Sequence, residues 1–544
     1  MLKANRLPFP QSRYYLLVLS VGSALLFWLG WPVKPFPFLL FVAMAPLFAI
    51  EKRATYEHYR HPGRVFFGYT YLTLFLWNLL TTWWVYYSTA VGAVFMLLAN
   101  ALLMSVPFVL FRLTKRAAGE AWGFFGFVLY WITFEYVHLN WDVSWPWLTL
   151  GNGFASFPEW VQWYEYTGVF GGTLWILLGN IAFYYVFLRD EALWRGLIRW
   201  RSLTYTLLWI VLPIVYSYVI YLRYEEKGEE VEVVVVQPNI NPYTEKFADG
   251  DAFIPYAEQV DRFAALAEQK ITPQTQFVLW PESAFDGAYW EPTFADTDVY
   301  QRIMAFKERN PQVSLVTGMT SLIRYDLPSE VTPTARYSED IGSYDVFNTA
   351  FFVPDQGDPV FYHKSRLVPG VEIMPYPKLL GFLSTLIFDL GGTSGGFGRQ
   401  DERTVLYNAD SLGGAPAICY ESIYGDYLTR FVRNGAEMIF IITNDGWWGN
   451  TAGHKQHLHY ATLRAVETRR SVARSANTGI SAFIDQRGNI HQATDYWEQA
   501  VIRGSIRAND QLTFYARHGD YLARTAAWLS VFVLLAALVK GKIT

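Results

Sequence analysis

Long apolar segments are the feature that most constrains how this chain of 544 residues can fold. They are concentrated in residues 1–222 and again from about residue 521, whereas the segment between them is more polar. A run of about 20 apolar residues is long enough to cross a bilayer core of roughly 30 Å. The composition agrees, since 52% of the residues are hydrophobic and 18% are aromatic. The pattern therefore predicts a membrane protein with one large polar segment.

Seven predicted membrane helices precede the polar segment, and an eighth follows it. The second is short, and the sequence defines its ends poorly. The first lacks a small-residue cleavage site and leads directly into another apolar segment, so we expect it to be retained rather than removed as a signal peptide. The predicted spans are Tyr14–Trp31, Phe36–Ile50, Val65–Tyr86, Thr89–Phe111, Ala121–Val137, Gly168–Leu188, Leu203–Leu222 and Tyr521–Val539.

Lysine and arginine are distributed unevenly over the predicted loops. With the N-terminus inside, the inner loops carry most of the basic residues, whereas the outer loops carry Lys34 and none between His138 and Glu165. Basic loops stay on the cytoplasmic side, so the polar segment is expected on the outer face, which in a bacterium is the periplasmic side of the inner membrane. We therefore expect seven helices in residues 1–222, a periplasmic domain in 223–520, and a C-terminal helix with a cytoplasmic tail in 521–544.

The polar segment alternates short β-branched runs with helix-like stretches. Glu232–Gln237 and Met438–Thr443 are typical of buried strands, whereas Pro255–Gln269 and His457–Arg474 have the charged and apolar faces of helices. This alternation predicts an α/β domain with its own core. The net charge of −4 provides no basic surface, so nucleic acid is not an expected partner.

Cys419 is the single cysteine of the chain and follows the apolar run Ala415–Ile418. It is either a small buried hydrophobic residue, as free cysteines often are, or a catalytic nucleophile at a strand end. Glu282 and Lys364 also follow predicted strands, and functional groups gather beyond strand ends in open α/β sheets. The three would suit acyl transfer, because a carboxylate can take the thiol proton and an ammonium can stabilise a tetrahedral oxyanion.

The order of these residues and of the motifs around them resembles the nitrilase, or carbon–nitrogen hydrolase, superfamily, whose triad is Glu, Lys and Cys. The flanking helices narrow the resemblance to the apolipoprotein N-acyltransferase family, as do Pro146–Leu148 and Tyr515–Arg517. This resemblance implies an α/β domain built as an αββα sandwich, joined to an α-helical transmembrane bundle of about eight helices. The motifs are Trp280–Ser283, Tyr362–Pro369, Cys419–Glu421, Asn444–Trp448, Arg464–Glu467 and Asn477–Ser481.

The resemblance also implies a reaction. An acyl chain would pass from a phospholipid to the α-amine of the diacylglyceryl-cysteine that begins an apolipoprotein, at the surface of the lipid bilayer and without a cofactor. By motif, Cys419 would be the nucleophile that carries the acyl thioester, Glu282 the general base and Lys364 the residue that stabilises the oxyanion. For Glu372, Tyr420 and Glu421, either direct chemistry or support of the triad stays open. The supporting residues carried over by motif are Glu372, Tyr420, Glu421, Asn444 and Trp447.

An apolar stretch inside the polar segment, residues 379–388, is too short to span a bilayer. It is either a core helix or a lid that dips into the membrane surface, and the glycine-rich residues 391–398 would then form its hinge. No metal is expected, because the histidines of Gly453–His459 lack a cysteine partner and lie at a polar helix start. The lid candidates are Leu379, Phe382, Leu383 and Phe388.

Three places depart from the family pattern, namely Gly370–Val371, Pro238 and Phe247. None is a triad residue, so they bear on the shape of the lipid pocket. Two other functions stay open. A membrane-tethered amidase would share the triad, and a scaffold or transporter would carry charged residues within its spans, for which Glu135 is the main candidate.

Overall fold

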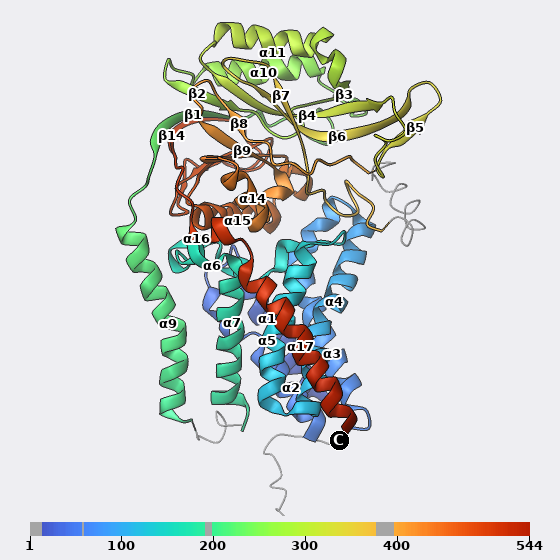
Figure 1. Ribbon diagram of the computed structural model, residues 1–544, viewed down its shortest axis with the longest axis vertical. Helices are drawn as coiled ribbons and strands as arrows, with labels where there is room; N and C mark the ends of the chain where they lie inside the picture. Colours follow the sequence, from blue (N-terminus) through green and yellow to red (C-terminus); the bar gives the residue numbers. More distant parts are fainter. Residues whose placement is uncertain (1–12, 57–58, 191–197, 377–395, 544) are drawn as a thin grey trace, which may run out of the picture.

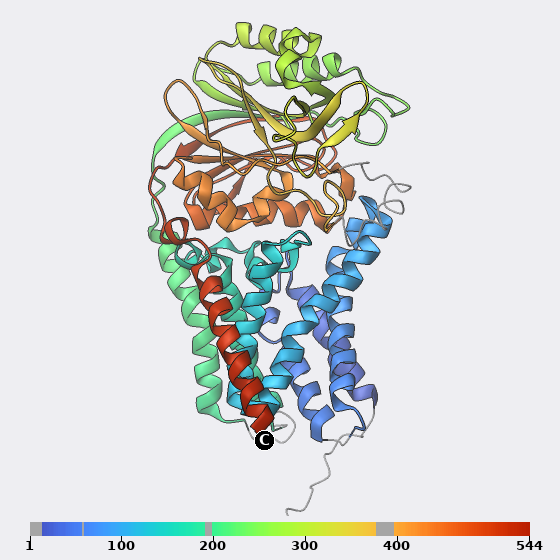
Figure 2. The same cartoon turned by 45° about the vertical axis from the view of Figure 1, so that its right-hand side comes forward.

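A layered sandwich sits on one end of a helical bundle in the computed structural model, which describes residues 13–56, 59–190, 198–376 and 396–543 (Figure 1). Helix α9 (Trp200–Arg223) runs up to the sandwich, and α17 (Tyr521–Ile543) leads away from it. Both connections lie at the same end of the bundle, and the C-terminal end of α17 lies at the opposite end (Figures 1 and 2). The sandwich is therefore an insertion between two helices of the bundle.

Four of the described helices are long and apolar enough to cross a membrane: α4 (Ala90–Ala118), Val169–Leu188, α9 and Tyr521–Gly541 within α17. The segment Val169–Leu188 comprises α7 (Val169–Phe183) and one π-helical turn, Tyr184–Leu188. The count of eight spans stays a prediction. The remaining long helices of the bundle are α1 (Arg13–Gly30), α2 (Ala45–Tyr56), α3 (Pro62–Thr82) and α5 (Glu120–Leu139).

The second predicted span, Phe36–Ile50, is wrong as a single helix. The chain forms a short 3-10 helix, Pro37–Phe41, and begins α2 only at Ala45. Asn180 Oδ1 accepts hydrogen bonds from the backbone N–H groups of Met44 and Ala45, at 2.7 and 3.2 Å. This buried side chain replaces the partners that a continuous helix would provide, so the break has no unpaired amides at this point.

Two β-sheets form the middle of the sandwich. One has the order β14-β1-β2-β4-β6-β5, with β3 beside β4 and β7 beside β6, and the other has the order β13-β12-β11-β10-β9-β8. The strands of the first sheet are β1 (Glu229–Gln237), β2 (Thr275–Leu279), β3 (Phe285–Trp290), β4 (Ser314–Tyr325), β5 (Arg336–Ser338), β6 (Gly342–Val353), β7 (Val360–His363) and β14 (Ala500–Ala508). Those of the second are β8 (Leu406–Tyr407), β9 (Gly413–Ile418), β10 (Met438–Thr443), β11 (Ser471–Ala476), β12 (Ala482–Ile484) and β13 (Ile490–His491).

Helices cover the outer face of each sheet. On one side, α10 (Tyr256–Glu268) and α11 (Asp298–Arg309) lie farthest from the bundle, while α14 (Gly425–Arg433) and α15 (Ala452–Thr468) lie between the second sheet and the bundle (Figure 1). Strand β1 shows the layering, because Val234 and Val236 join the core under α10, whereas Val233 and Val235 join the core between the sheets. The predicted αββα sandwich is thus present.

The predicted helix His457–Arg474 is wrong in its last six residues, 469–474. Helix α15 ends at Thr468, and Arg469 has the left-handed backbone conformation (φ 52°) that commonly ends a helix. Residues 471–476 form β11, which pairs with β10 in parallel register. The error arose because a fully buried strand with arginine and serine has no alternating polar face for sequence reasoning to detect.

Candidate active site

Three side chains predicted to act together follow different strands and meet where the two sheets face each other. Glu282 lies shortly after β2, Lys364 directly after β7 and Cys419 directly after β9. The first two strands belong to one sheet and the third to the other. Cys419 interacts electrostatically with both Glu282 and Lys364. All three side chains are buried, with exposed fractions of 6% for Glu282, 1% for Lys364 and 9% for Cys419. The structure therefore brings the predicted trio together in a buried site with little access to solvent.

Lys364 is held between two carboxylates. Its Nζ lies 3.1 Å from Glu282 Oε1 and 2.8 Å from Glu372 Oε1. Asn348 Nδ2 donates to the same two oxygens, at 2.8 and 3.0 Å. Burial by itself disfavours the ammonium, but Glu282, Glu372 and Cys419 outweigh it and raise the pKa of Lys364 well above its usual value. The group therefore stays a cation throughout the physiological range.

The backbone that carries Glu282 is packed against a glycine. A Cβ on Gly318 of β4 would lie 2.6 Å from Glu282 Cα and 2.5 Å from the backbone nitrogen of Ser283. Ser283 itself has φ 47°, in the left-handed region. Strand β4 can approach the turn after β2 this closely only because position 318 lacks a side chain. The position of the Glu282 carboxylate thus depends on that glycine.

Cys419 lies at a sharp turn between strand and helix. Strand β9 ends at Ile418 and a 3-10 helix begins at Cys419 itself, whose φ of 50° is uncommon for a residue with a side chain. Strained conformations of this kind concentrate at functional sites. Burial and the Glu282 carboxylate raise the pKa of the thiol well above its usual value, and Lys364 opposes them only in part. The Cys419 side chain at rest is therefore a neutral thiol, which would need a base to become a thiolate.

Glu421 connects this turn to the loop that follows Lys364. It is fully buried, and its Oε2 accepts a hydrogen bond from the backbone N–H of Ile418 at 2.9 Å. Its Oε1 accepts from the backbone N–H groups of Ser365 and Arg366, at 2.7 and 3.1 Å. The hydroxyls of Tyr362 and Tyr427 also donate to Oε1, so the donors to Glu421 come from both sides of the site. Glu421 therefore links the Cys419 turn to the loop after Lys364, which favours support over direct chemistry.

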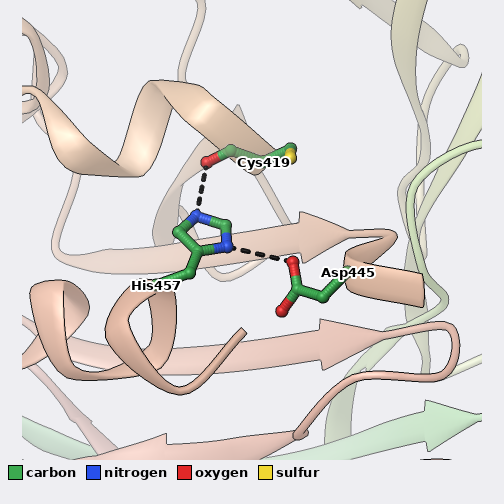
Figure 3. A group of neighbouring side chains, drawn as sticks. All are labelled: Cys419, Asp445 and His457. Carbon is green, nitrogen blue, oxygen red and sulfur yellow. Dashed lines mark hydrogen bonds and ion pairs between the residues drawn. The ribbon is translucent and has the colours of Figure 1, made fainter. Parts of the chain in front are cut away.

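A second group of side chains, which includes His457 and Asp445, lies next to the backbone of Cys419 (Figure 3). His457 Nδ1 is 3.0 Å from Asp445 Oδ1, and its Nε2 is 3.1 Å from the backbone oxygen of Cys419, while the sulfur points away from the ring. Burial would raise the pKa of Asp445, but Arg474 and His457 outweigh it and hold that pKa well below its usual range. His457 thus contacts the backbone of the turn and not the thiol.

Ligand atoms of Cys419, Asp445 and His457 lie within 4.8 Å of one another, as they would around a metal ion. Both ring nitrogens of His457 already have partners, since Nε2 also lies 2.9 Å from Ser422 Oγ. Both carboxylate oxygens of Asp445 are likewise engaged, one by His457 and the other by Arg474. These contacts favour a hydrogen-bonded support for the turn over a metal centre.

Of the other predicted supporting residues, Asn444 contacts the trio, whereas the side chains of Trp447 and Tyr420 contact other parts of the molecule. The backbone N–H of Asn444 donates to Glu282 Oε2 at 3.1 Å. Trp447 stacks on Phe247, with ring centroids 5.7 Å apart. Tyr420 OH donates to the backbone oxygen of Ser144, at 3.0 Å, and thereby ties the nucleophile's neighbour to the loop after α5. The lid candidates Leu379, Phe382, Leu383 and Phe388 lie outside the described residues.

Comparison with known families shows which protein family this chain belongs to. The family profile described as Carbon-nitrogen hydrolase matches residues 233–511, which include the whole trio. The chain belongs to the carbon–nitrogen hydrolase family. A second profile, described as Apolipoprotein N-acyltransferase N-terminal domain, matches residues 23–182 in the helical bundle.

Curated relatives match almost end to end. An apolipoprotein N-acyltransferase of Chlorobaculum tepidum is 29% identical over 527 residues, which cover 94% of each chain. One of Geobacter metallireducens is 27% identical over 522 residues, covering 93% of this chain and 92% of the relative. Among solved structures, a carbon–nitrogen hydrolase from Helicobacter pylori matches with 12% identity and a TM-score of 0.35, covering 56% of this chain and 94% of that one. The similarity to the two curated relatives thus extends beyond the hydrolase domain into the bundle.

Sequence reasoning missed two residues of this carbon–nitrogen hydrolase site. Asn348 contacts both Glu282 and Glu372, and its signal was a polar side chain within the apolar strand β6. His457 was considered only as a metal ligand, yet it holds the backbone of Cys419. Sequence spacing does not reveal either contact, because β6 belongs to the first sheet and α15 covers the second sheet.

Proposed function

We propose that this protein is an apolipoprotein N-acyltransferase with a Glu282–Lys364–Cys419 triad. The observation that carries the proposal is the buried contact of Lys364 with Glu282 beside Cys419, in a hydrolase domain seated on apolar helices. The near end-to-end similarity to relatives of that name supports acyl transfer over simple amide hydrolysis. The acyl donor is a phospholipid, and the acceptor is the N-terminal α-amine of diacylglyceryl-cysteine in an apolipoprotein.

Acylation of the enzyme is the first half of the proposed reaction. Glu282 takes the proton of the Cys419 thiol, and the sulfur attacks the carbonyl carbon of a phospholipid ester. The Lys364 ammonium stabilises the oxyanion that forms. The carbon–oxygen bond then breaks, Glu282 returns the proton to the departing alkoxide, and a lysophospholipid leaves. Cys419 now carries the acyl chain as a thioester.

Transfer to the acceptor is the second half. The free α-amine attacks the thioester carbonyl carbon, and the carbon–sulfur bond breaks. Glu282 takes a proton from the amine and returns it to the thiolate, so the enzyme regains its starting state in a ping-pong cycle. Water would compete with the amine, and the buried position of the triad restricts its access.

The membrane arrangement is part of the same proposal. Both substrates are lipids, so the site must open toward a bilayer surface, and Tyr420 already contacts the loop after α5. We place the bundle in the bacterial inner membrane and the sandwich on its periplasmic side, in agreement with the distribution of basic residues over the loops.

Intact-protein mass spectrometry tests the proposal directly. Incubation of the purified protein with phospholipid should add one acyl mass, and because Cys419 is the single cysteine, an adduct that hydroxylamine removes at neutral pH is assigned to its thioester. A diacylglyceryl peptide with a free N-terminus should discharge the adduct as an amide, whereas the N-acetylated peptide should not. The Cys419→Ala and Glu282→Gln variants should form no adduct. Absence of the adduct in the native protein, together with ammonia release from small amides, would favour an amidase.

A further inference from the structure

Arg366 lies two residues after Lys364, where the sandwich meets the bundle. Its backbone N–H donates to Glu421 Oε1 at 3.1 Å, which ties it to the nucleophile's turn. Its Nη2 donates to the side-chain oxygen of Asn140, the residue that ends α5, at 3.3 Å. Its guanidinium lies over the ring of Tyr424, 5.2 Å from the centroid. Arg366 is thus a cation between the active site and the end of a bundle helix.

The charge of Arg366 has no carboxylate partner among the described residues. Its Nε is buried without a hydrogen-bond partner there. Other arginines in this part of the molecule are paired, since Arg464 contacts Glu467, Arg469 contacts Glu165 and Arg474 contacts Asp445. A buried donor without a partner destabilises the folded protein, so such a group favours binding of an acceptor. An arginine without a carboxylate partner beside the active site suggests that a bound ligand supplies the anion.

A neighbouring arginine shows what a purely structural role looks like. Arg403 also has no carboxylate partner among the described residues, but its Nη1 donates to Ser365 Oγ at 3.0 Å and to the backbone oxygens of Asp401 and Glu402, at 2.8 and 3.2 Å. Those bonds tie the guanidinium to its own loop and to the loop after β7, although its Nε, like that of Arg366, is buried without a hydrogen-bond partner among the described residues. Within the part of the chain that the structure describes, the Arg366 side chain makes one hydrogen bond, the 3.3 Å contact with Asn140.

We propose that Arg366 binds the phosphodiester group of the phospholipid acyl donor. This inference rests on the proposed function and adds the group that distinguishes the two lipid substrates. The donor carries a phosphodiester anion next to its esters. The diacylglyceryl end of the acceptor has no phosphate, and it carries a basic α-amine instead. A guanidinium matches phosphate oxygens in geometry and charge. The place of Arg366 at the bundle end suits a head group at the bilayer surface.

A comparison of two acyl donors, one with and one without a phosphate, distinguishes phosphate binding by Arg366 from a general role in the site. The full-length protein in lipid nanodiscs would be given either a phospholipid or a diacylglycerol with the same acyl chains, which lacks the phosphate. The Arg366→Gln variant should raise KM for the phospholipid about tenfold or more, as expected for a lost charge-assisted hydrogen bond. Its acylation by diacylglycerol should match that of the native protein, and Arg366→Lys should fall between them.

The source of the phosphate is tested by competition. Soluble glycerophosphoethanolamine should inhibit the native protein and lose that effect in Arg366→Gln, whereas inorganic phosphate should inhibit neither. Equal inhibition by inorganic phosphate would overturn the assignment to a head group. The exposed Arg262 of α10 forms the matched control, because Arg262→Gln removes the same charge far from the site.

Three results would overturn the inference. They are an unchanged KM for phospholipid in Arg366→Gln, an equal loss with both donors, and a raised KM for the acceptor peptide instead of the donor. The proposed function is judged separately, by whether the native protein forms the Cys419 adduct with any donor. A native enzyme acylated by both donors, with the Arg366 variant unaffected, would leave the acyltransferase standing and remove the phosphate site.

Discussion

Helices α10 and α15 cover opposite faces of the same sandwich but have very different surroundings. Along α10, exposed residues alternate with buried ones, and its Glu258–Arg262 ion pair lies on the surface. Along α15, only Lys455 is exposed, and the Arg464–Glu467 pair is almost completely buried. Bundle elements pack against α15 from the side opposite the sheet (Figure 2). A helix covered on both sides has to pair each polar group with protein.

Gln456 and Tyr460 of α15 meet that demand with partners in the bundle, and so attach the sandwich to it. Gln456 Nε2 donates to the backbone oxygen of Pro32 at 2.8 Å, and Gln456 Oε1 accepts from Trp147 Nε1 at 2.7 Å. Tyr460 OH donates to the backbone oxygen of Trp147, also at 2.8 Å. Because His457 on the same helix holds Cys419, docking and active-site geometry depend on one element. Among the described residues, α10 contacts elements of the sandwich and makes no such hydrogen bonds to the bundle.

The largest difference between the two helices should appear when a buried pair is broken. Arg464→Leu leaves Glu467 as an uncompensated buried carboxylate, which typically costs about 3–5 kcal/mol. We expect a large drop in the melting temperature of the detergent-solubilised protein. A drop no larger than that of Arg262→Gln on α10 would contradict the view that α15 is enclosed.

Removal of the histidine that holds the nucleophile's turn should lower activity more than stability. We expect His457→Phe to reduce kcat for adduct formation on Cys419 about 10- to 100-fold with little change in KM, because a misplaced thiol affects chemistry and not lipid binding. His457→Gln retains a donor for the Cys419 carbonyl and should recover part of the rate. Equal losses in both variants, or a change confined to KM, would argue against this positioning role.

Acid should stabilise the junction between α15 and α17. Burial and the nearby Asp426 raise the pKa of Asp520 to about 7, and burial likewise raises that of Glu467 to about 7. The folded state then retains protons that the unfolded chain releases, so this contribution is present at acidic pH and is lost as the pH rises through about 7.

The melting temperature should therefore be higher at pH 6 than at pH 8, by about 2 °C or more. In Asp520→Asn the difference should shrink, because one titrating group is gone. A pH dependence of the same size in that variant would assign the effect to other groups.

The smallest effect is expected on the exposed side of the sandwich. The Glu258–Arg262 pair is 2.9 Å long but solvent-accessible, and exposed pairs of this spacing contribute only about 0.3–0.5 kcal/mol. Glu258→Gln and Arg262→Gln should each leave melting temperature and acylation nearly unchanged. A marked loss in either would mean that α10 also contacts a partner.

Sequence reasoning succeeded where local pattern and covalent order were sufficient. Strands such as Met438–Thr443 were predicted with their observed bounds, because a run of β-branched and aromatic residues between turns has few alternatives. It failed at Ser471–Arg474, where burial on both faces removes the alternation that distinguishes a strand from a helix. It also failed at Phe36–Ile50, where the side chain of Asn180 stabilises a break.

The sequence by itself determined the separation into apolar and polar parts, the single thiol, and the positions of Glu282, Lys364 and Cys419 after three separate strands, since each follows from local composition and order. Only the tertiary structure decided that Lys364 lies between Glu282 and Glu372, that Asn348 and His457 belong to the site, and that Arg366 lacks a carboxylate partner among the described residues. The reason is physical: the electrostatics of a buried charge depend on neighbours that packing brings from distant parts of the chain.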